Sequence, residues 1–362
     1  TMYKSLPTWA KRALLNLKSN RWWILVGPRL YLHSPHHKHF LSQKWESFEA
    51  RLTDPSIRVY VKLAKWFLPP SSVSLNHSGF VISHLGRFGN ATREIVGAYA
   101  LAHSLSLGNV VMIGPNGFRE GGPLAHPGIH DTRSGISVWI GATTFRKVPP
   151  LDMWVSWKRG SFPVAPGAGD IAWGAAPGFL GLAGEQQSLG SKTLVIHLRG
   201  GDVFGGREAP EYGQPPLGFY VKVLTHRAWR QVVIVHEDHR NPVLQGLLDY
   251  CRGEGIPARP VSGTLRDDLA VLLSAENLVA SRGTFGPAVV GLSLHAKNVY
   301  YFEDKFAIYP PKTGVTLFRA QDTSGEYRDK ILRSNWQHSP SQLALMLSYD
   351  SEKIRIDDGQ QT

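Results

Sequence analysis

The pattern of apolar and polar residues changes near residue 78 of this 362-residue chain. Beyond that point, short apolar runs of strand length alternate with longer segments whose apolar residues recur at helical spacing. The first of these segments predict strands at 79–84 and 109–114, with a helix at 91–106 between them. A strand, a helix and a second strand in this order form a βαβ unit with parallel strands.

The alternation is clearest after residue 193. Strands are predicted at 193–198, 231–236, 259–262, 277–281 and 298–302, and helices at 242–252, 267–275 and 286–295. Two helix starts carry capping residues, because Asn241 precedes Pro242 and Thr264 is followed three positions later by Asp267. Strands that alternate with helices indicate a parallel sheet covered on both faces. One sheet from each half predicts an α/β fold of two Rossmann-like domains facing each other across a cleft.

Four segments follow from these patterns. Residues 1–75 form a basic, helical extension, 76–190 the first Rossmann-like domain, 191–310 the second, and 311–362 a C-terminal extension that packs back on the body. Within the first domain, residues 115–190 are rich in Gly, Pro and Trp and show little periodicity. We expect long loops there, with short strands or helices.

Charge is concentrated at the N-terminus. The net charge is +12, and residues 1–75 hold 12 Lys and Arg against 3 Asp and Glu. Tryptophan, leucine and basic residues are mixed in 6–26, which is typical of a helix lying on an anionic membrane. The favoured alternative is a helix packed on the rest of the protein. The longest apolar stretch there, WWILVG at 22–27, is too short to span a bilayer.

Other features bear on location and on metal binding. The single cysteine, Cys251, excludes an internal disulfide, which is compatible with a reducing compartment or a secretory lumen. We therefore expect a cytoplasmic or membrane-peripheral protein in a bacterium, or a Golgi or ER lumenal one in a eukaryote if an anchor precedes the chain. The histidines of HSPHHKHF at 33–40 have no carboxylate or thiol beside them, so a polar loop is favoured over a metal site.

Polar residues gather where the predicted strands end, and ligands of open α/β sheets bind outside the carboxyl ends of the strands. Four clusters occupy such ends: His197, Arg199 and Asp202; His236, Glu237 and Asp238; Ser281, Thr284 and Phe285; and the loop from Gly86 to Asn90. The alternation of a strand places His197 and Arg199 on one face. A guanidinium there matches the paired oxygens of a diphosphate, and Gly200 and Gly201 let the backbone approach. The alternative is a surface pair of Arg199 with Asp202 that stabilises a turn.

These clusters carry a resemblance. The segment His-Leu-Arg-Gly-Gly-Asp at 197–202 resembles the His-x-Arg-Arg-Gly-Asp motif of the superfamily of α1,2-, α1,6- and protein O-fucosyltransferases. GRFGN at 86–90 is similar to the N-terminal glycine loop of the same superfamily. PPLGFYVKVL at 215–224, HED at 236–238, the segment 267–285 and KNVYYF at 297–302 follow in the same order. The resemblance covers 79–303, although 115–190 matches only by position.

The resemblance implies an inverting glycosyltransferase of the GT-B type that transfers a sugar, L-fucose above all, from a GDP-linked donor to a glycan hydroxyl. Arg199 would hold the β-phosphate and stabilise the charge on departing GDP, supported by His197. The remaining implied roles are donor binding by Gly200, Asp238, Asp267, Asp268, Ser281, Thr284 and Phe285, and acceptor-side closure by Gly86, Arg87, Gly89 and Asn90.

One position departs from the motif. The second arginine of the superfamily is Gly200 in this chain, so one cationic contact is missing. Arg282 or Arg87 could replace it in space. We expect nucleotide binding to survive the change, whereas the lost contact bears on the identity of the donor and on the catalytic strength.

The sequence also bears on a metal requirement and on the choice of general base. It contains no Asp-x-Asp tripeptide, and Arg199 with helix N-termini could supply the positive charge, so we expect no metal or other cofactor. Asp202, Glu208 and Glu211 are candidates for the general base, with Glu208 ranked first. A loose, fucosyl-cation-like route without a protein base is the alternative.

Three classes of function remain. The first is an enzyme that uses GDP-fucose or another nucleotide sugar, with a glycan acceptor as its second partner. The second is a non-catalytic glycan- or nucleotide-binding homologue, which the glycine at position 200 makes conceivable. A nucleic-acid binder is disfavoured, because the charge lies outside the α/β body and no nucleic-acid motif accompanies it.

Overall fold

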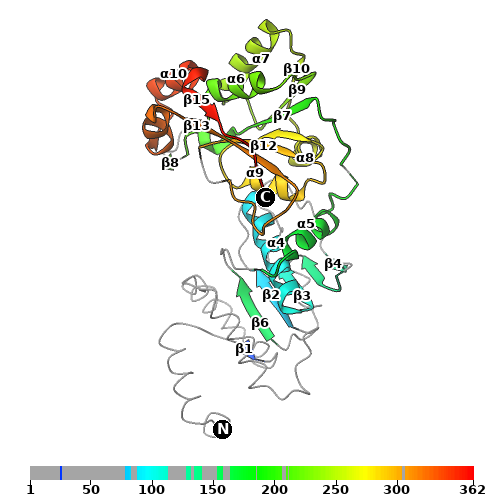
Figure 1. Ribbon diagram of the computed structural model, residues 1–362. Helices are drawn as coiled ribbons and strands as arrows, with labels where there is room; N and C mark the ends of the chain where they lie inside the picture. Colours follow the sequence, from blue (N-terminus) through cyan, green and yellow to red (C-terminus); the bar gives the residue numbers. More distant parts are fainter. Residues whose placement is uncertain are drawn as a thin grey trace. The chain divides into compact units, whose positions relative to one another are not determined.

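The described part of the chain falls into two compact units in a computed structural model (Figure 1). The described residues are 25–26, 78–82, 88–112, 128–131, 134–140, 153–157, 164–184, 186–205, 209–210, 212–303 and 306–362. Described residues within 1–84, 98–115 and 127–165 form the first unit, and those within 85–97 and 166–362 form the second. The predicted helical extension 1–75 therefore lies outside the described residues, apart from 25–26.

The first unit contains a six-stranded sheet in the order β1-β6-β2-β3-β5-β4. Its strands are β1 (Leu25–Val26), β2 (Ser78–Ile82), β3 (Asn109–Met112), β4 (Gly128–Asp131), β5 (Ser137–Ile140) and β6 (Met153–Trp157). The four central strands run parallel, and β1 and β4 are antiparallel to their neighbours. The predicted βαβ unit is confirmed as β2, α4 (Phe88–Leu105) and β3, with the helix beginning earlier than expected.

The second unit is built on an eight-stranded sheet in the order β10-β9-β7-β11-β12-β13-β15, with β16 also pairing with β13. Its strands are β7 (Thr193–Leu198), β9 (Gln231–His236), β10 (Ala258–Val261), β11 (Asn277–Val279), β12 (Asn298–Phe302), β13 (Thr316–Asp322), β15 (Ile354–Ile356) and β16 (Gln360–Gln361). The five strands β10, β9, β7, β11 and β12 are parallel, as predicted. The sheet continues with β13, which is parallel to β12, and with β15 and β16, which are antiparallel to β13. A short ribbon pairs β8 (Ala209–Pro210) with β14 (Asn335–Trp336).

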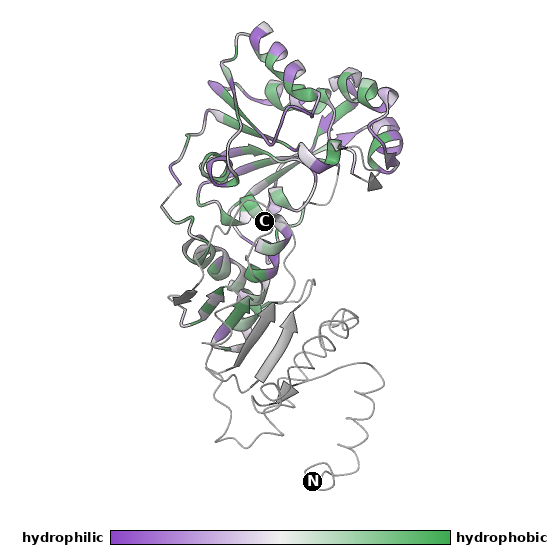
Figure 2. Cartoon of the chain, turned by 180° about the vertical axis from the view of Figure 1, so that it is seen from behind, coloured by the Kyte–Doolittle hydropathy of each residue, from purple (hydrophilic) through white to green (hydrophobic). Residues whose placement is uncertain are grey.

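The second unit also contains helices. They are α5 (Ala168–Phe179), α6 (Leu217–His226), α7 (Val243–Gly253), α8 (Leu265–Leu273), α9 (Phe285–Leu292) and α10 (Pro340–Ser348), with shorter helical turns at Gly201–Phe204, Arg328–Leu332 and Ser351–Lys353. Hydrophobic colour follows the strands, whereas α7 carries both hydrophilic and hydrophobic residues (Figure 2). The buried side of α7 includes Val243, Leu247 and Cys251, so this helix is amphipathic.

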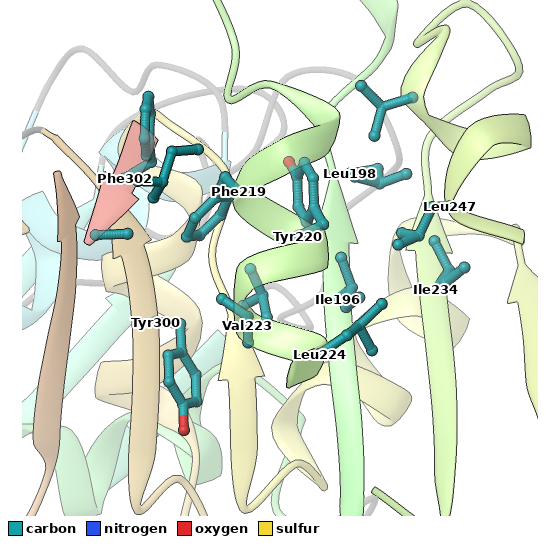
Figure 3. Close-up of a cluster of buried hydrophobic side chains, with 14 of the residues drawn as sticks. Ile196, Leu198, Phe219, Tyr220, Val223, Leu224, Ile234, Leu247, Tyr300 and Phe302 are labelled. Carbon is teal, nitrogen blue, oxygen red and sulfur yellow. The ribbon is translucent and has the colours of Figure 1, made fainter. Parts of the chain in front are cut away.

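A hydrophobic core of the second unit includes buried side chains of the sheet and of α6 (Figure 3). Ile196 and Leu198 of β7 pack there with Phe219 and Val223 of α6, all buried. Side chains alternate along a strand, so His197 points to the opposite face, where its ring contacts Phe285 of α9. The strand is apolar almost throughout because both faces are covered.

Two segments differ from the predicted domain limits. Residues 311–362 contribute β13, β15 and β16 to the sheet instead of forming an extension beside it. Residues 166–190 belong to the second unit, although the sequence pattern placed them in the first domain. The reason is the packing of α5, where Trp173 lies against Gly291 of α9 and its Nε1 donates to the Pro310 carbonyl at 2.7 Å.

Candidate functional site

His197 joins two strands at their carboxyl ends. Its Nδ1 lies 2.7 Å from Oγ of the buried Ser281, which follows β11. The imidazole also packs on Phe285, with 4.7 Å between ring centroids. Burial, with a further contribution from the nearby charge of Arg199, lowers the pKa of His197 to about 3. At neutral pH the ring is uncharged, so it positions its neighbours and carries no positive charge of its own.

Arg199 lies directly after β7 and reaches the turn formed by 281–284. Its Nη1 donates to the Arg282 carbonyl at 3.3 Å, and its guanidinium lies 5.1 Å from the ring centre of Tyr212. Nη2 is 3.5 Å from Asp202 Oδ1, in a pair whose carboxylate is 42% exposed. The predicted alternative of an Arg199–Asp202 pair is therefore present, but so exposed a pair contributes little stability.

Two glycines allow the loop after Arg199 to lie close to the loop after β9. A Cβ at Gly200 would be 2.5 Å from Asp238 Oδ1, and Gly201 has φ +60° with its Cβ direction facing the Glu237 carboxylate. Asp238 accepts hydrogen bonds from the Gly201 amide at 3.0 Å and the Arg240 amide at 2.9 Å, and it pairs with Arg240 Nε at 3.1 Å. Asp238 thus orders this loop, and its carboxylate occupies the space that a side chain at position 200 would need.

The turn from Ser281 to Thr284 is shaped by Arg199 and Gly283. Gly283 has φ +122°, and a Cβ there would be 2.6 Å from Arg199 Nη1, so glycine lets the guanidinium lie against the backbone. Arg282 is held in turn, because its Nη1 donates to the Gly213 carbonyl at 2.6 Å. Phe285 is the first residue of α9, and Thr284 is its N-cap residue.

The start of α4 reaches the same turn. Phe88 packs on Phe285, with 5.6 Å between centroids, and a Cβ at Gly89 would be 2.7 Å from the Phe285 amide nitrogen. Gly89 and Asn90 were predicted to lie in a loop, but they belong to the first turn of the helix. The predicted residues Gly86 and Arg87 lie outside the described residues. Neither α4 nor α9 has an acidic residue in its first turn, so both N-terminal dipoles leave positive potential here.

A pocket of about 320 Å³ opens beside this turn. Its lining residues are Arg93, Ala280, Ser281, Arg282, Gly283, Thr284, Pro287, Tyr301, Phe302, Phe306 and Ala307. None of these described residues is acidic. His197 and Arg199 do not line the pocket; they contact the Ser281–Thr284 turn that forms its wall. Sequence reasoning missed Arg93, which the helical spacing of four residues from Gly89 could have indicated.

The two aspartates predicted to hold the nucleoside differ from each other. Asp267 completes the predicted capping box of α8, accepting from the Thr264 amide at 3.0 Å and its hydroxyl at 2.7 Å. Asp268 accepts from the Gly263 amide at 3.0 Å. Burial raises the pKa of Asp268 to about 6, against the effect of this hydrogen bond and with the charges of Asp267 and Glu237 contributing. Neither carboxylate lines the pocket.

The candidate bases are only partly placed. Asp202 is exposed and contacts Arg199, whereas Glu208 and Glu211 lie outside the described residues. Asn241, predicted to cap its helix, accepts from the Val243 amide at 3.1 Å and donates to the Arg199 carbonyl at 2.9 Å. The helix begins at Val243, one residue later than predicted, and its N-cap residue is Pro242 instead of Asn241.

Metal and membrane features can be judged only for the part of the chain that the structure describes. There, no group of three or more His, Cys, Asp or Glu residues has a metal-binding arrangement. The histidines of 33–40 and the basic segment 6–26 lie outside it, apart from the strand at 25–26. The described helices include none with the length and apolar character needed to cross a bilayer.

Comparison with protein-family models and with curated protein sequences gives no match.

Proposed function

We propose that the chain is an inverting glycosyltransferase that transfers a sugar, above all L-fucose, from a GDP-linked donor to a glycan hydroxyl. The observation that carries the proposal is a surface with three arginines around the Ser281–Thr284 turn. Arg199 contacts this turn, and Arg93 and Arg282 line the adjoining pocket, near the N-terminal turns of α4 and α9. Such a surface suits a diphosphate, which carries several negative oxygens.

The position of the turn supports a nucleotide ligand. It follows β11 in the second unit and is hydrogen-bonded to His197 at the end of the neighbouring strand, β7. Ligands of open α/β sheets bind outside such strand ends. The aromatic residues Tyr301 and Phe306, with 5.3 Å between ring centroids, add an apolar side to the pocket. A base or sugar would bury apolar surface on them while its phosphates face the arginines.

The proposal gives the candidate site residues distinct chemical roles. Arg199 would stabilise the charge that develops on the departing diphosphate, and a contact of this kind strengthens in the transition state. Neutral His197 would hold the Ser281–Thr284 turn in place by its hydrogen bond to Ser281. Asp202, Glu208 or Glu211 would accept the proton of the attacking hydroxyl. The proposal includes a GT-B architecture, which is supported by the mainly parallel sheet in each of the two units. It also includes a reaction that needs no metal.

A non-catalytic nucleotide-binding protein is the second candidate. It is favoured by the absence of a carboxylate among the described residues that line the pocket, since glycosyl transfer to a hydroxyl commonly uses a base. Such a protein would bind GDP and release none from GDP-fucose.

A transfer assay distinguishes the two candidates. GDP-, UDP- and CMP-sugars are supplied with β-galactoside acceptors without added metal, and release of the nucleotide is measured. The enzyme should release GDP, and Arg199→Ala should lower the rate by about 10²-fold or more. Arg252→Ala, at a side chain 75% exposed on α7, is the matched control and should keep full activity. An Arg199→Ala variant as active as the wild type would reject the proposed role.

A further inference from the structure

One of the basic side chains that line the pocket, Arg93, lies outside the motif loops identified from the sequence. Arg93 lies in α4, whereas the other lining residues come from the segments 280–287 and 301–307. The residue four positions before it, Gly89, lies on the same face of the helix, about one turn away. A Cβ at Gly89 would be 2.7 Å from backbone atoms of both Thr284 and Phe285. This close approach fixes the start of α4 against α9 and thereby sets where Arg93 meets the pocket.

Several side chains that line the pocket can donate hydrogen bonds to an anion. Arg93 and Arg282 line it together with the hydroxyls of Ser281 and Thr284, and no acidic residue is among the described lining residues. Arg282 is anchored by its bond to the Gly213 carbonyl at 2.6 Å. A second planar guanidinium from α4 gives the pocket a second set of donors for phosphate oxygens.

We propose that Arg93 is a phosphate-binding residue and supplies the second cation that is missing at Gly200. At position 200 the Asp238 carboxylate excludes a side chain, so an arginine there could not reach a ligand without disturbing the loop. Arg93, from α4, lines the same pocket as the Ser281–Thr284 turn. The ligand class is a diphosphate; its assignment to a GDP-linked donor rests on the proposed function, whereas the anion site itself does not.

Two probes and three variants test this assignment. Calorimetry measures binding of GDP and of inorganic pyrophosphate to the wild type, Arg93→Gln, Arg93→Lys and the control Arg252→Gln. Arg93→Gln should lower the affinity for both probes at least tenfold, or by about 1.4 kcal/mol, whereas the control should bind them with unchanged affinity. Arg93→Lys should restore part of the affinity, because lysine keeps the positive charge but lacks the planar set of donors that a guanidinium presents to phosphate oxygens. If Arg93 had only a structural role, its replacement would lower the melting temperature, and Arg93→Lys would not restore the affinity for the probes.

The outcomes separate the two proposals. If the wild type binds GDP and Arg93→Gln binds it equally well, the role of Arg93 is overturned and the proposed function stands. If the wild type binds pyrophosphate through Arg93 but does not bind GDP, the anion site stands and the GDP-linked donor is rejected. If the wild type binds neither probe, both proposals are rejected. Should Arg93→Gln fail to fold, weaker GDP binding by folded Arg93→Lys supports the role, and unchanged binding overturns it.

Discussion

Ser281 Oγ lies 2.7 Å from Nδ1 of His197, so a hydrogen bond joins the loop after β11 to the end of β7. The bond lies at the carboxyl edge of the sheet, where open α/β proteins bind ligands. It also ties the imidazole to the turn that Arg199 contacts through the Arg282 carbonyl at 3.3 Å. Both groups at the end of β7 thus contact the same turn.

We expect His197 to remain neutral well below its ordinary range. Burial and the charge of Arg199 lower its pKa to about 3 in the folded protein, against 6.5 as the ordinary value. The unfolded chain therefore binds more protons than the folded one between these values. The free energy of unfolding consequently decreases as pH falls from 6.5 towards 3. Histidine NMR should show no titration of this ring above pH 5, and an ordinary titration near 6.5 would contradict the burial.

The substitution Gly89→Ala should destabilise the protein by about 1–3 kcal/mol. The new Cβ would meet backbone atoms of Thr284 and Phe285 at 2.7 Å, which no side-chain rotation can relieve. Gly174→Ala is the matched control, since this helical glycine in α5 has nothing within 4 Å of its Cβ direction. Urea unfolding should show the control unchanged or up to about 1 kcal/mol more stable. Equal effects of the two substitutions would argue against close contact between α4 and α9.

The loop at position 200 should respond to Asp238. Gly200→Ala places a Cβ 2.5 Å from Asp238 Oδ1 and should displace the carboxylate from the Gly201 amide, at a cost of about 1–2 kcal/mol. In an Asp238→Ala background the same change should cost much less, because its obstacle has been removed. Urea unfolding of the two single variants and the double variant measures this coupling. Strict additivity would mean that the carboxylate does not occupy that space.

Asp322→Asn should destabilise the second unit by about 2–4 kcal/mol. Burial opposes ionisation of Asp322, but hydrogen bonds from Tyr349, Arg328, Ser324 and Gly325 outweigh it and lower the pKa. Because the folded pKa is depressed, this stability is present above the ordinary value of 3.8 and is lost as pH falls below it. Chemical unfolding at pH 7 and at pH 3 should show a smaller difference between variant and wild type at pH 3. A difference that stays constant would contradict this role.

The architecture of the second unit was largely predictable from sequence, because its strands and helices have clear periodicity. The strands at 193–198, 231–236 and 298–302 have their predicted limits. The capping box at Thr264 and Asp267 is also confirmed. Local rules suffice in these cases, since a buried parallel strand is apolar throughout and a helix cap is a contact over three residues.

The rest depended on contacts between distant segments. The assignment of α5 to the second unit comes from Trp173, whose partners Gly291 and Pro310 are more than a hundred residues away. For the site, sequence placed Ser281 and Thr284 at a strand end, but it gave no sign that Asp238 closes the space at Gly200. Arg93 was missed because pocket lining is decided by how α4 packs, whereas a helical arginine is most often a solvated surface residue.

Binding of GDP to the wild type and to Arg199→Ala tests the central claim most directly. Calorimetry at neutral pH without metal should give a measurable dissociation constant for the wild type. Removal of the guanidinium should raise that constant by about tenfold or more, while Arg252→Ala leaves it unchanged. Failure of the wild type to bind GDP at high concentration, or equal affinity in Arg199→Ala, would contradict the assignment of this site to a nucleotide diphosphate.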